Sequence, residues 1–128
     1  MHKNDIEKLK HLTHQLIELN HKALNQFKAS SKVKEYTPNF YEEIKPFSDQ
    51  IYEAATQWKT LALEWVQQNH NRYFYPHQIE NTYENLLAVS VQAFQKKSHS
   101  TLFHSMIKSN DYVLQSMKQY LSSQQINW

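Results

Sequence analysis

Apolar residues recur along this chain at steps of three and four in four separate stretches, which is the spacing of one face of an α-helix. The stretches span residues 5–28, 39–68, 76–95 and 99–122, and loops of three to ten residues join them. Amphipathic helices of this length joined by short loops pack as antiparallel neighbours. The pattern therefore predicts one all-α domain over residues 1–128, an antiparallel up-down-up-down four-helix bundle with a polar tail at 123–128.

The second stretch contains a proline inside an otherwise helical pattern. Pro46 has no N–H to donate, and its ring crowds the preceding turn. Yet the apolar positions keep one helical phase from Phe40 to Trp65. We interpret this stretch as a continuous helix kinked near Pro46, and the alternative is a single turn feeding a helix that begins at the proline. Asn39 and Glu42 have the spacing of a capping box at its start.

Histidines in the first stretch suggest a metal site. His11, His14, Glu18 and His21 follow one another at steps of three, four and three, so they share a helix face. This face lies opposite the apolar stripe, which favours a solvated surface, with an adventitious zinc or nickel site as the alternative. A di-iron site of the ferritin type needs two Glu-x-x-His motifs that point inward. Because the chain has only Glu18 with His21, pointing outward, we expect no metal site.

The third stretch, PHQIENTYENLLAVSVQAF over residues 76–94, is unusually polar for a core helix. Tyr83 and Ser90 fall on its apolar face, and His77, Glu80 and Glu84 share one edge. These three residues could form an acid/base pair or a site for a hard metal. We expect a structural role instead, because carboxylates near a helix N-terminus are favourable and no nucleophile or cofactor motif accompanies them.

The fourth stretch carries an asparagine in the middle of its apolar face. Asn110 is flanked by apolar positions one helical turn away on both sides. It either hydrogen-bonds a core partner and helps to set the helix register, or marks a place where the apolar stripe opens to solvent.

Aromatic side chains crowd the loop before the third stretch. Arg72 is followed by Tyr73, Phe74 and Tyr75, and tyrosine with arginine is the combination that protein interfaces favour. The alternative is that this segment closes one end of the core.

Composition removes several classes of function. The chain has no glycine, which excludes a phosphate-binding P-loop and a dinucleotide fingerprint. It has no cysteine, which removes disulfides and cysteine nucleophiles and fits a reducing compartment. No secretory signal and no apolar run of about 20 residues is present. We therefore expect a cytoplasmic protein without a membrane partner and without a cofactor.

Charge is distributed unevenly although the net charge is only +2. Residues 1–34 carry seven lysines against three acids, and residues 96–128 carry four lysines against one acid. The first and last helices of an up-down bundle are neighbours, so these lysines would form one basic side. A solvated face is the preferred interpretation, because the lysines are not interleaved with exposed aromatics as in single-strand binders.

Three segments together resemble a known family. FYEEIKPF, WKTLALEW and PHQIENTYENLLAVSVQAF occur in the order seen in the YppE-like family of small uncharacterised proteins from Bacillus-type bacteria, and the resemblance covers about residues 5–120. It implies a four-helix bundle and a domain of unknown function, with no established site residues. Members usually carry His-Pro where this chain has Pro76-His77, which gives no support for a fixed chemical role of His77.

These observations favour a non-catalytic helical protein that binds another protein. The expected docking surface is formed by Arg72, Tyr73, Tyr75, His77, Glu80 and Glu84. One alternative is a metal-dependent or acid/base enzyme that uses the His77, Glu80 and Glu84 edge, with Glu64 across the bundle. Another is a weak anion or nucleic-acid binder that uses the basic side, although nucleic acid is not the expected partner. A homo-oligomer is compatible with the sequence.

Overall fold

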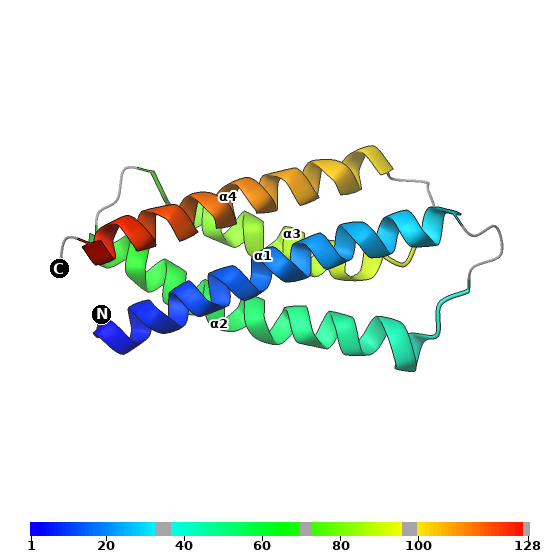
Figure 1. Ribbon diagram of the computed structural model, residues 1–128, viewed down its shortest axis with the longest axis horizontal. Helices are drawn as coiled ribbons and strands as arrows, with labels where there is room; N and C mark the ends of the chain where they lie inside the picture. The colour runs from blue at the N-terminus through cyan, green and yellow to red at the C-terminus, as the bar shows by residue number, and fades with distance from the viewer. Residues whose placement is uncertain (33–36, 70–72, 96–99, 127–128) are drawn as a thin grey trace.

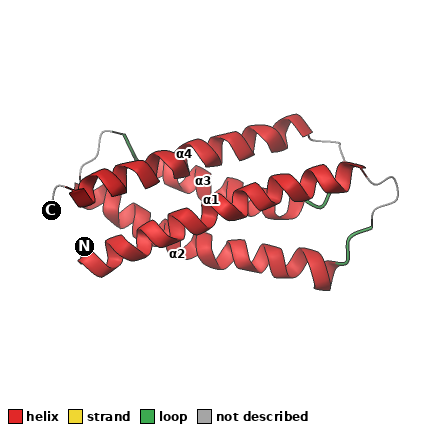
Figure 2. Cartoon of the chain, viewed as in Figure 1, coloured by secondary structure: helices red, strands yellow, loops and turns green. Residues whose placement is uncertain are grey.

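The computed structural model describes residues 1–32, 37–69, 73–95 and 100–126. Within these residues the chain forms four α-helices and one π-helical turn, and it contains no strand (Figure 2). The helices are α1 (Lys3–Lys32), α2 (Lys45–Asn69), α3 (Pro76–Gln92) and α4 (Ser100–Ile126), and the π-helical turn η1 (Phe40–Ile44) leads directly into α2. None of the described helices is long and apolar enough to cross a membrane.

The helices run up, down, up and down along one long axis, so both chain ends lie at the same end of the bundle (Figure 1). Helix α1 packs beside α2 and α4, and α3 packs beside the same two helices. The predicted antiparallel four-helix bundle is confirmed. The expected helix at 5–28 is longer at both ends, and the expected helix at 76–95 ends three residues earlier, at Gln92.

Two groups of buried side chains fill the interior. The larger group extends from the centre of the bundle to the end that holds the chain termini, and it contains the fully buried Trp58 and Trp65 of α2. The smaller group fills the opposite end, where Phe27 of α1 and Phe103 of α4 stack with ring centroids 4.2 Å apart. The apolar stripes read from the sequence face inward over most of their length, with Phe40 and Leu102 as exposed exceptions near helix starts, and their burial supplies the main driving force for folding.

The irregularity expected near Pro46 takes the form of the π-helical turn η1. The N–H of Ile44 donates to the carbonyl of Asn39 at 3.2 Å, and the N–H of Lys45 donates to the carbonyl of Phe40, both across five residues. A π turn is wider than an α turn. It precedes Pro46 at the place where a regular α-helix would set the proline ring against the carbonyl four residues earlier.

The capping box at the start of η1 differs from the expected one by one residue. Asn39 Oδ1 accepts a hydrogen bond from the N–H of Glu42 at 3.0 Å, as expected for a cap. The carboxylate that accepts from the N–H of Asn39 belongs to Glu43, at 2.8 Å, and not to Glu42. The wider π turn changes which glutamate lies over the helix start.

Buried polar side chains link α1 to two neighbouring helices. Asn110 is 0% exposed, and its Nδ2 donates to Asn20 Oδ1 at 3.1 Å. Asn20 Nδ2 in turn donates to the carbonyl of Ile107 at 3.1 Å. Asn110 therefore bonds a core partner, and the alternative of an apolar stripe open to solvent is wrong.

The second buried link joins α1 to α2. Thr13 accepts a hydrogen bond from Trp58 Nε1 at 3.1 Å and donates one to the carbonyl of Leu9.

Candidate binding site: a tyrosine-lined groove

The histidines of α1 lie on the surface, as predicted. His11, His14 and His21 are all exposed. Nδ1 of His14 lies 3.3 Å from Nζ of Lys118 on α4, and its Nε2 lies 2.9 Å from a carboxylate oxygen of Glu18. His21 contacts Asp111 of α4 at 3.2 Å. These contacts join the outer surfaces of α1 and α4, and no three His, Asp or Glu side chains of the described residues are grouped to hold a metal ion.

Helices α1 and α4 are neighbours, so the two lysine-rich parts of the sequence lie next to each other in the bundle (Figure 1). The exposed lysines of these two helices, among the described residues, are Lys3, Lys8, Lys22, Lys28, Lys108 and Lys118. Glu7, Glu18 and Asp111 share the two helices with them. The mixture of signs favours a solvated face over a site for a polyanion.

The acidic edge of α3 is also exposed. His77, Glu80 and Glu84 are all solvent-accessible, and none of them lines either of the two surface hollows described below. Glu64 of α2 is half-buried and accepts a hydrogen bond from Gln68 at 3.3 Å. Neither of these two hollows therefore provides a recess for a substrate beside the His77, Glu80 and Glu84 edge.

The aromatic segment before α3 has one buried ring and two exposed rings. Phe74 is only 3% exposed, and its ring lies 5.5 Å from that of Trp65 and 5.9 Å from that of Tyr120, so it closes this end of the core. Tyr73 and Tyr75 are 70% and 54% exposed. Arg72 lies outside the described residues. The segment therefore anchors itself through one ring and presents the other two to solvent.

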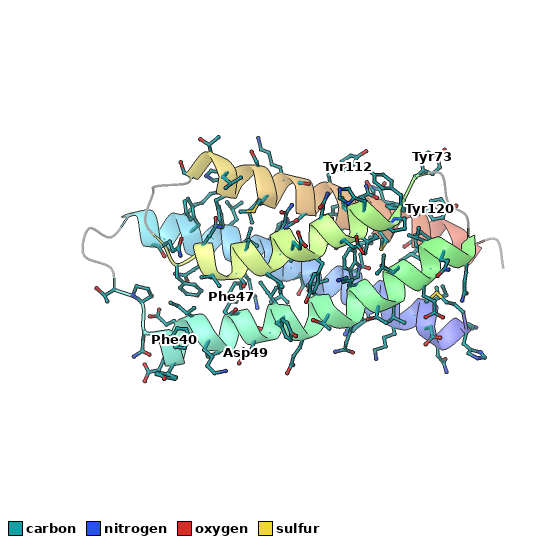
Figure 3. All side chains as sticks on the ribbon, turned by 180° about the vertical axis from the view of Figure 1, so that it is seen from behind. Phe40, Phe47, Asp49, Tyr73, Tyr112 and Tyr120 are labelled. Carbon is teal, nitrogen blue, oxygen red and sulfur yellow. The ribbon has the colours of Figure 1, made fainter. Side chains whose placement is uncertain are left out.

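A groove of about 310 Å³ lies between this segment, the start of α3 and the outer face of α4. Figure 3 shows Tyr73, Tyr112 and Tyr120 together at this end of the bundle. The groove is lined by Tyr73, Phe74, Gln78, Tyr112, Ser116, Gln119 and Tyr120.

The groove has a packed base and exposed rings at its two sides. The Tyr120 ring packs edge-on against Trp65 at 5.6 Å and against Phe74 at 5.9 Å. It also lies 6.3 Å from the ring of Tyr73. Tyr112 on the other side is 71% exposed. Two exposed tyrosines thus flank a third that the core holds in place.

The described lining residues carry no charged side chain. They offer tyrosine hydroxyls, two amides and one serine hydroxyl, next to aromatic rings. The Oε1 of Gln78 is buried and has no hydrogen-bond partner in the described part of the chain. Among the described residues, this lining has no carboxylate, histidine or lysine side chain, and its polar groups are amides and hydroxyls.

Only one side of this groove was expected from the sequence, at Tyr73, and neither Gln78 nor the residues of α4 were singled out. A signal for α4 exists, because Tyr112, Ser116 and Tyr120 follow one another at steps of four and Gln119 lies three residues after Ser116, so all four fall on one side of the helix. Tyr75, His77, Glu80 and Glu84 are not part of the lining.

A second hollow, of about 490 Å³, lies at the opposite end of the bundle. It is lined by Lys22, Asn25, Gln26, Ala29, Glu43, Phe47 and Phe94. Its lining carries charges of both signs, and it lies beside the helix ends that lead into residues 33–36 and 96–99. The described lining of the groove combines three tyrosines with no charged side chain, and for this reason the groove is the candidate binding site.

Comparisons with known proteins agree with this architecture. The chain is 28% identical to the uncharacterized protein YppE of Bacillus subtilis (strain 168) over 107 residues, which cover 84% of this chain and 86% of the relative. A crystal structure of the Bacillus subtilis protein superposes with a TM-score of 0.84 at 26% identity, covering 93% of this chain and 96% of that one. A crystal structure of a protein of unknown function from Listeria innocua gives a TM-score of 0.89 at 25% identity, covering 94% and 96%.

The family profile described as "Bacterial domain of unknown function (DUF1798)" matches residues 13–121. This range includes every described element that forms the groove. The resemblance stated from the three sequence segments is confirmed, and the chain belongs to the DUF1798 family of bacterial proteins.

Proposed function

We propose that this protein is a non-catalytic interaction module that binds another protein through the tyrosine-lined groove. The observation that carries the proposal is the exposure of Tyr73 and Tyr112 on both sides of a groove that has a packed base and whose described lining is uncharged. Tyrosine is enriched at protein interfaces because a rigid ring and a hydroxyl together give a large contact area with a polar end. The proposal places this interaction in the cytoplasm, since a chain without cysteine suits a reducing compartment.

The proposed surface differs from the one expected from the sequence alone. Tyr73 belongs to both surfaces, whereas the contribution of α4 replaces the edge formed by His77, Glu80 and Glu84. We favour the groove over this edge because of the cost of desolvation. A partner that covers Glu80 and Glu84 removes hydration from two carboxylates, whereas a partner that covers the groove mainly buries aromatic rings.

A paired set of double variants tests the proposal. Tyr73→Ala with Tyr112→Ala removes the two exposed rings of the groove. Tyr41→Ala with Tyr52→Ala removes two exposed tyrosines from η1 and α2, and serves as the matched control. Each tagged protein is used to purify partners from cells that encode it, and crosslinking mass spectrometry then maps the contact on the partner and on this chain.

We expect a partner that is recovered with the wild type and the control, crosslinks next to the groove, and is lost with the groove variant. The melting temperatures of all three proteins should agree closely, because exposed side chains contribute little to stability. If the groove variant retains every partner of the wild type, or if no protein depends on the groove, the proposal is wrong.

A further inference from the structure

We infer that the buried pair of Asn20 and Asn110 fixes the register of α4 against α1, and thereby decides which side chains of α4 line the groove. Asn20 lies on α1 and Asn110 on α4, and both are 0% exposed. The consequence for binding rests on the proposed function, whereas the register itself does not.

The apolar contacts of α4 select a register only weakly. Hydrophobic burial is non-directional, and a core keeps most of its stability when apolar side chains of similar volume exchange places. A shift of α4 by one turn would set one apolar side chain where another now lies. The buried apolar residues of α4, in the part of the chain that is described, are Phe103, Met106, Ile107, Val113, Leu114, Met117 and Leu121.

The two amides are far more selective. Asn110 Nδ2 donates to Asn20 Oδ1 at 3.1 Å, and Asn20 Nδ2 donates to the carbonyl of Ile107 at 3.1 Å. A one-turn shift of α4 in either direction would break both hydrogen bonds and leave the two amides buried against apolar side chains. An unpaired buried polar group costs more free energy than a made hydrogen bond contributes. The positions of α4 one turn from Asn110 are Met106, Ile107, Val113 and Leu114.

The surface contacts between the same two helices agree with this register but cannot hold it. His21 contacts Asp111 at 3.2 Å, with side chains that are 55% and 39% exposed. His14 Nδ1 lies 3.3 Å from Nζ of Lys118, also at the surface. Contacts of this kind contribute little free energy because water competes for the same groups. The buried pair is therefore the contact that distinguishes one register from the next.

Stability is not what the pair is built for. The Oδ1 of Asn110 is buried and has no hydrogen-bond partner in the described part of the chain. Replacing two buried polar partners by apolar groups of similar size is often neutral or stabilising. A buried asparagine between two helices is known to specify register at a cost in stability, and the Asn20–Asn110 pair has this character.

The register of α4 positions the groove. Tyr112 and Tyr120 line it from α4, and Ser116 lies four residues from each of them. A shift by one turn moves these side chains about 5 Å along the helix axis. It brings the small Ser116 to the level that one of the two tyrosines now occupies, and the ring that faces Tyr73 is lost.

The test measures a distance between α1 and α4 in the full chain. The chain has no cysteine, so Lys8→Cys with Lys108→Cys gives two exposed sites for nitroxide labels. Twelve residues separate Lys8 from Asn20 along α1, so the labels lie at different levels and a shift of α4 changes their separation. Double electron–electron resonance reports the distribution of this separation, and thermal denaturation reports the melting temperature.

We expect a single separation in the wild-type background. Asn20→Leu with Asn110→Leu should melt at or above the wild-type temperature and add a second separation that differs by about 5 Å. Ser48→Ala with Ser90→Ala serves as the matched control, because it removes a hydroxyl pair at 3.2 Å between α2 and α3 and should leave the single separation unchanged.

Two outcomes would overturn the inference. If the double-leucine variant keeps the single separation of the wild type, the amides do not set the register. If it melts well below the wild type, the pair serves stability instead.

Recovery of cellular partners separates this inference from the proposed function. A second separation in the double-leucine variant supports the register even if no partner depends on the groove, in which case only the proposed function fails. If Tyr73→Ala with Tyr112→Ala removes a partner while the double-leucine variant keeps one separation, only the register inference fails.

Discussion

The two ends of the bundle both present aromatic rings to solvent, but they do so in different ways. At one end, Tyr73 and Tyr112 come from segments far apart in the sequence and flank the groove (Figure 3). At the other end, Phe40 and Tyr41 are sequence neighbours on the turn η1, and their rings meet edge to face at 5.2 Å. The first pair encloses a recess, whereas the second pair projects from a single turn.

The charges around the two pairs also differ. Glu42 and Glu43 follow the η1 pair directly, and Lys45 pairs with Asp49 at 2.8 Å one turn later. The described lining of the groove carries no charge. Exposed aromatic residues therefore indicate a binding surface only where separate elements bring them together around a hollow. Exposure alone does not distinguish the two ends.

The largest expected difference between the two ends is in stability. Trp65 is fully buried and packs against Phe74 and Tyr120 beneath the groove. Trp65→Ala should lower the free energy of unfolding by about 3–5 kcal/mol, because it removes a large buried ring and leaves a cavity. Phe40→Ala on η1 should change it by less than about 0.5 kcal/mol. Urea denaturation measures both, and similar losses would show that η1 is packed into the core as firmly as the base of the groove.

The helix starts at the two ends should respond in opposite directions. Asn39 caps η1 with its side chain, whereas Tyr75 occupies the N-cap position of α3 without a side-chain hydrogen bond. Asn39→Ala should therefore lower the free energy of unfolding by about 1 kcal/mol, and Tyr75→Asp should raise it by about 1 kcal/mol. Tyr75→Ala separates the loss of the ring from the gain of a cap. If Tyr75→Asp is no more stable than Tyr75→Ala, then a side-chain cap does not stabilise the start of α3.

The smallest expected effect concerns the amide of Gln78. Its buried Oε1 lacks a partner among the described residues, and replacing such a group by an apolar one of similar size removes a desolvation cost. Gln78→Met should raise the free energy of unfolding by up to about 1 kcal/mol, which urea denaturation measures. Gln119→Met, at an exposed position of the same groove, should leave stability within about 0.5 kcal/mol. Equal effects on stability would mean that the Oε1 of Gln78 has a hydrogen-bond partner in the free protein.

The architecture could be predicted from the sequence because its signals are local. Each apolar stripe lies within one helix, and short loops leave an antiparallel neighbour as the simplest arrangement. The same holds for the outward-facing histidines, which lie opposite the stripe of α1. Asn110 was placed on the apolar face of its helix on this basis, but its burial and its partner Asn20 were not determined, because nothing within α1 marks Asn20 as the residue that faces α4.

The groove could not be predicted in the same way, because it is formed by contacts between segments that are distant in the sequence. The sequence showed an aromatic segment at 73–75, but periodicity within one helix does not tell which face of another helix lies beside a loop. The packing of Phe74 between Trp65 and Tyr120 sets Tyr73 beside α4 and leaves the acidic edge of α3 outside the lining. Local periodicity thus determined the four helices and their buried faces. Only the tertiary packing of distant segments decided where an uncharged, tyrosine-lined surface would form.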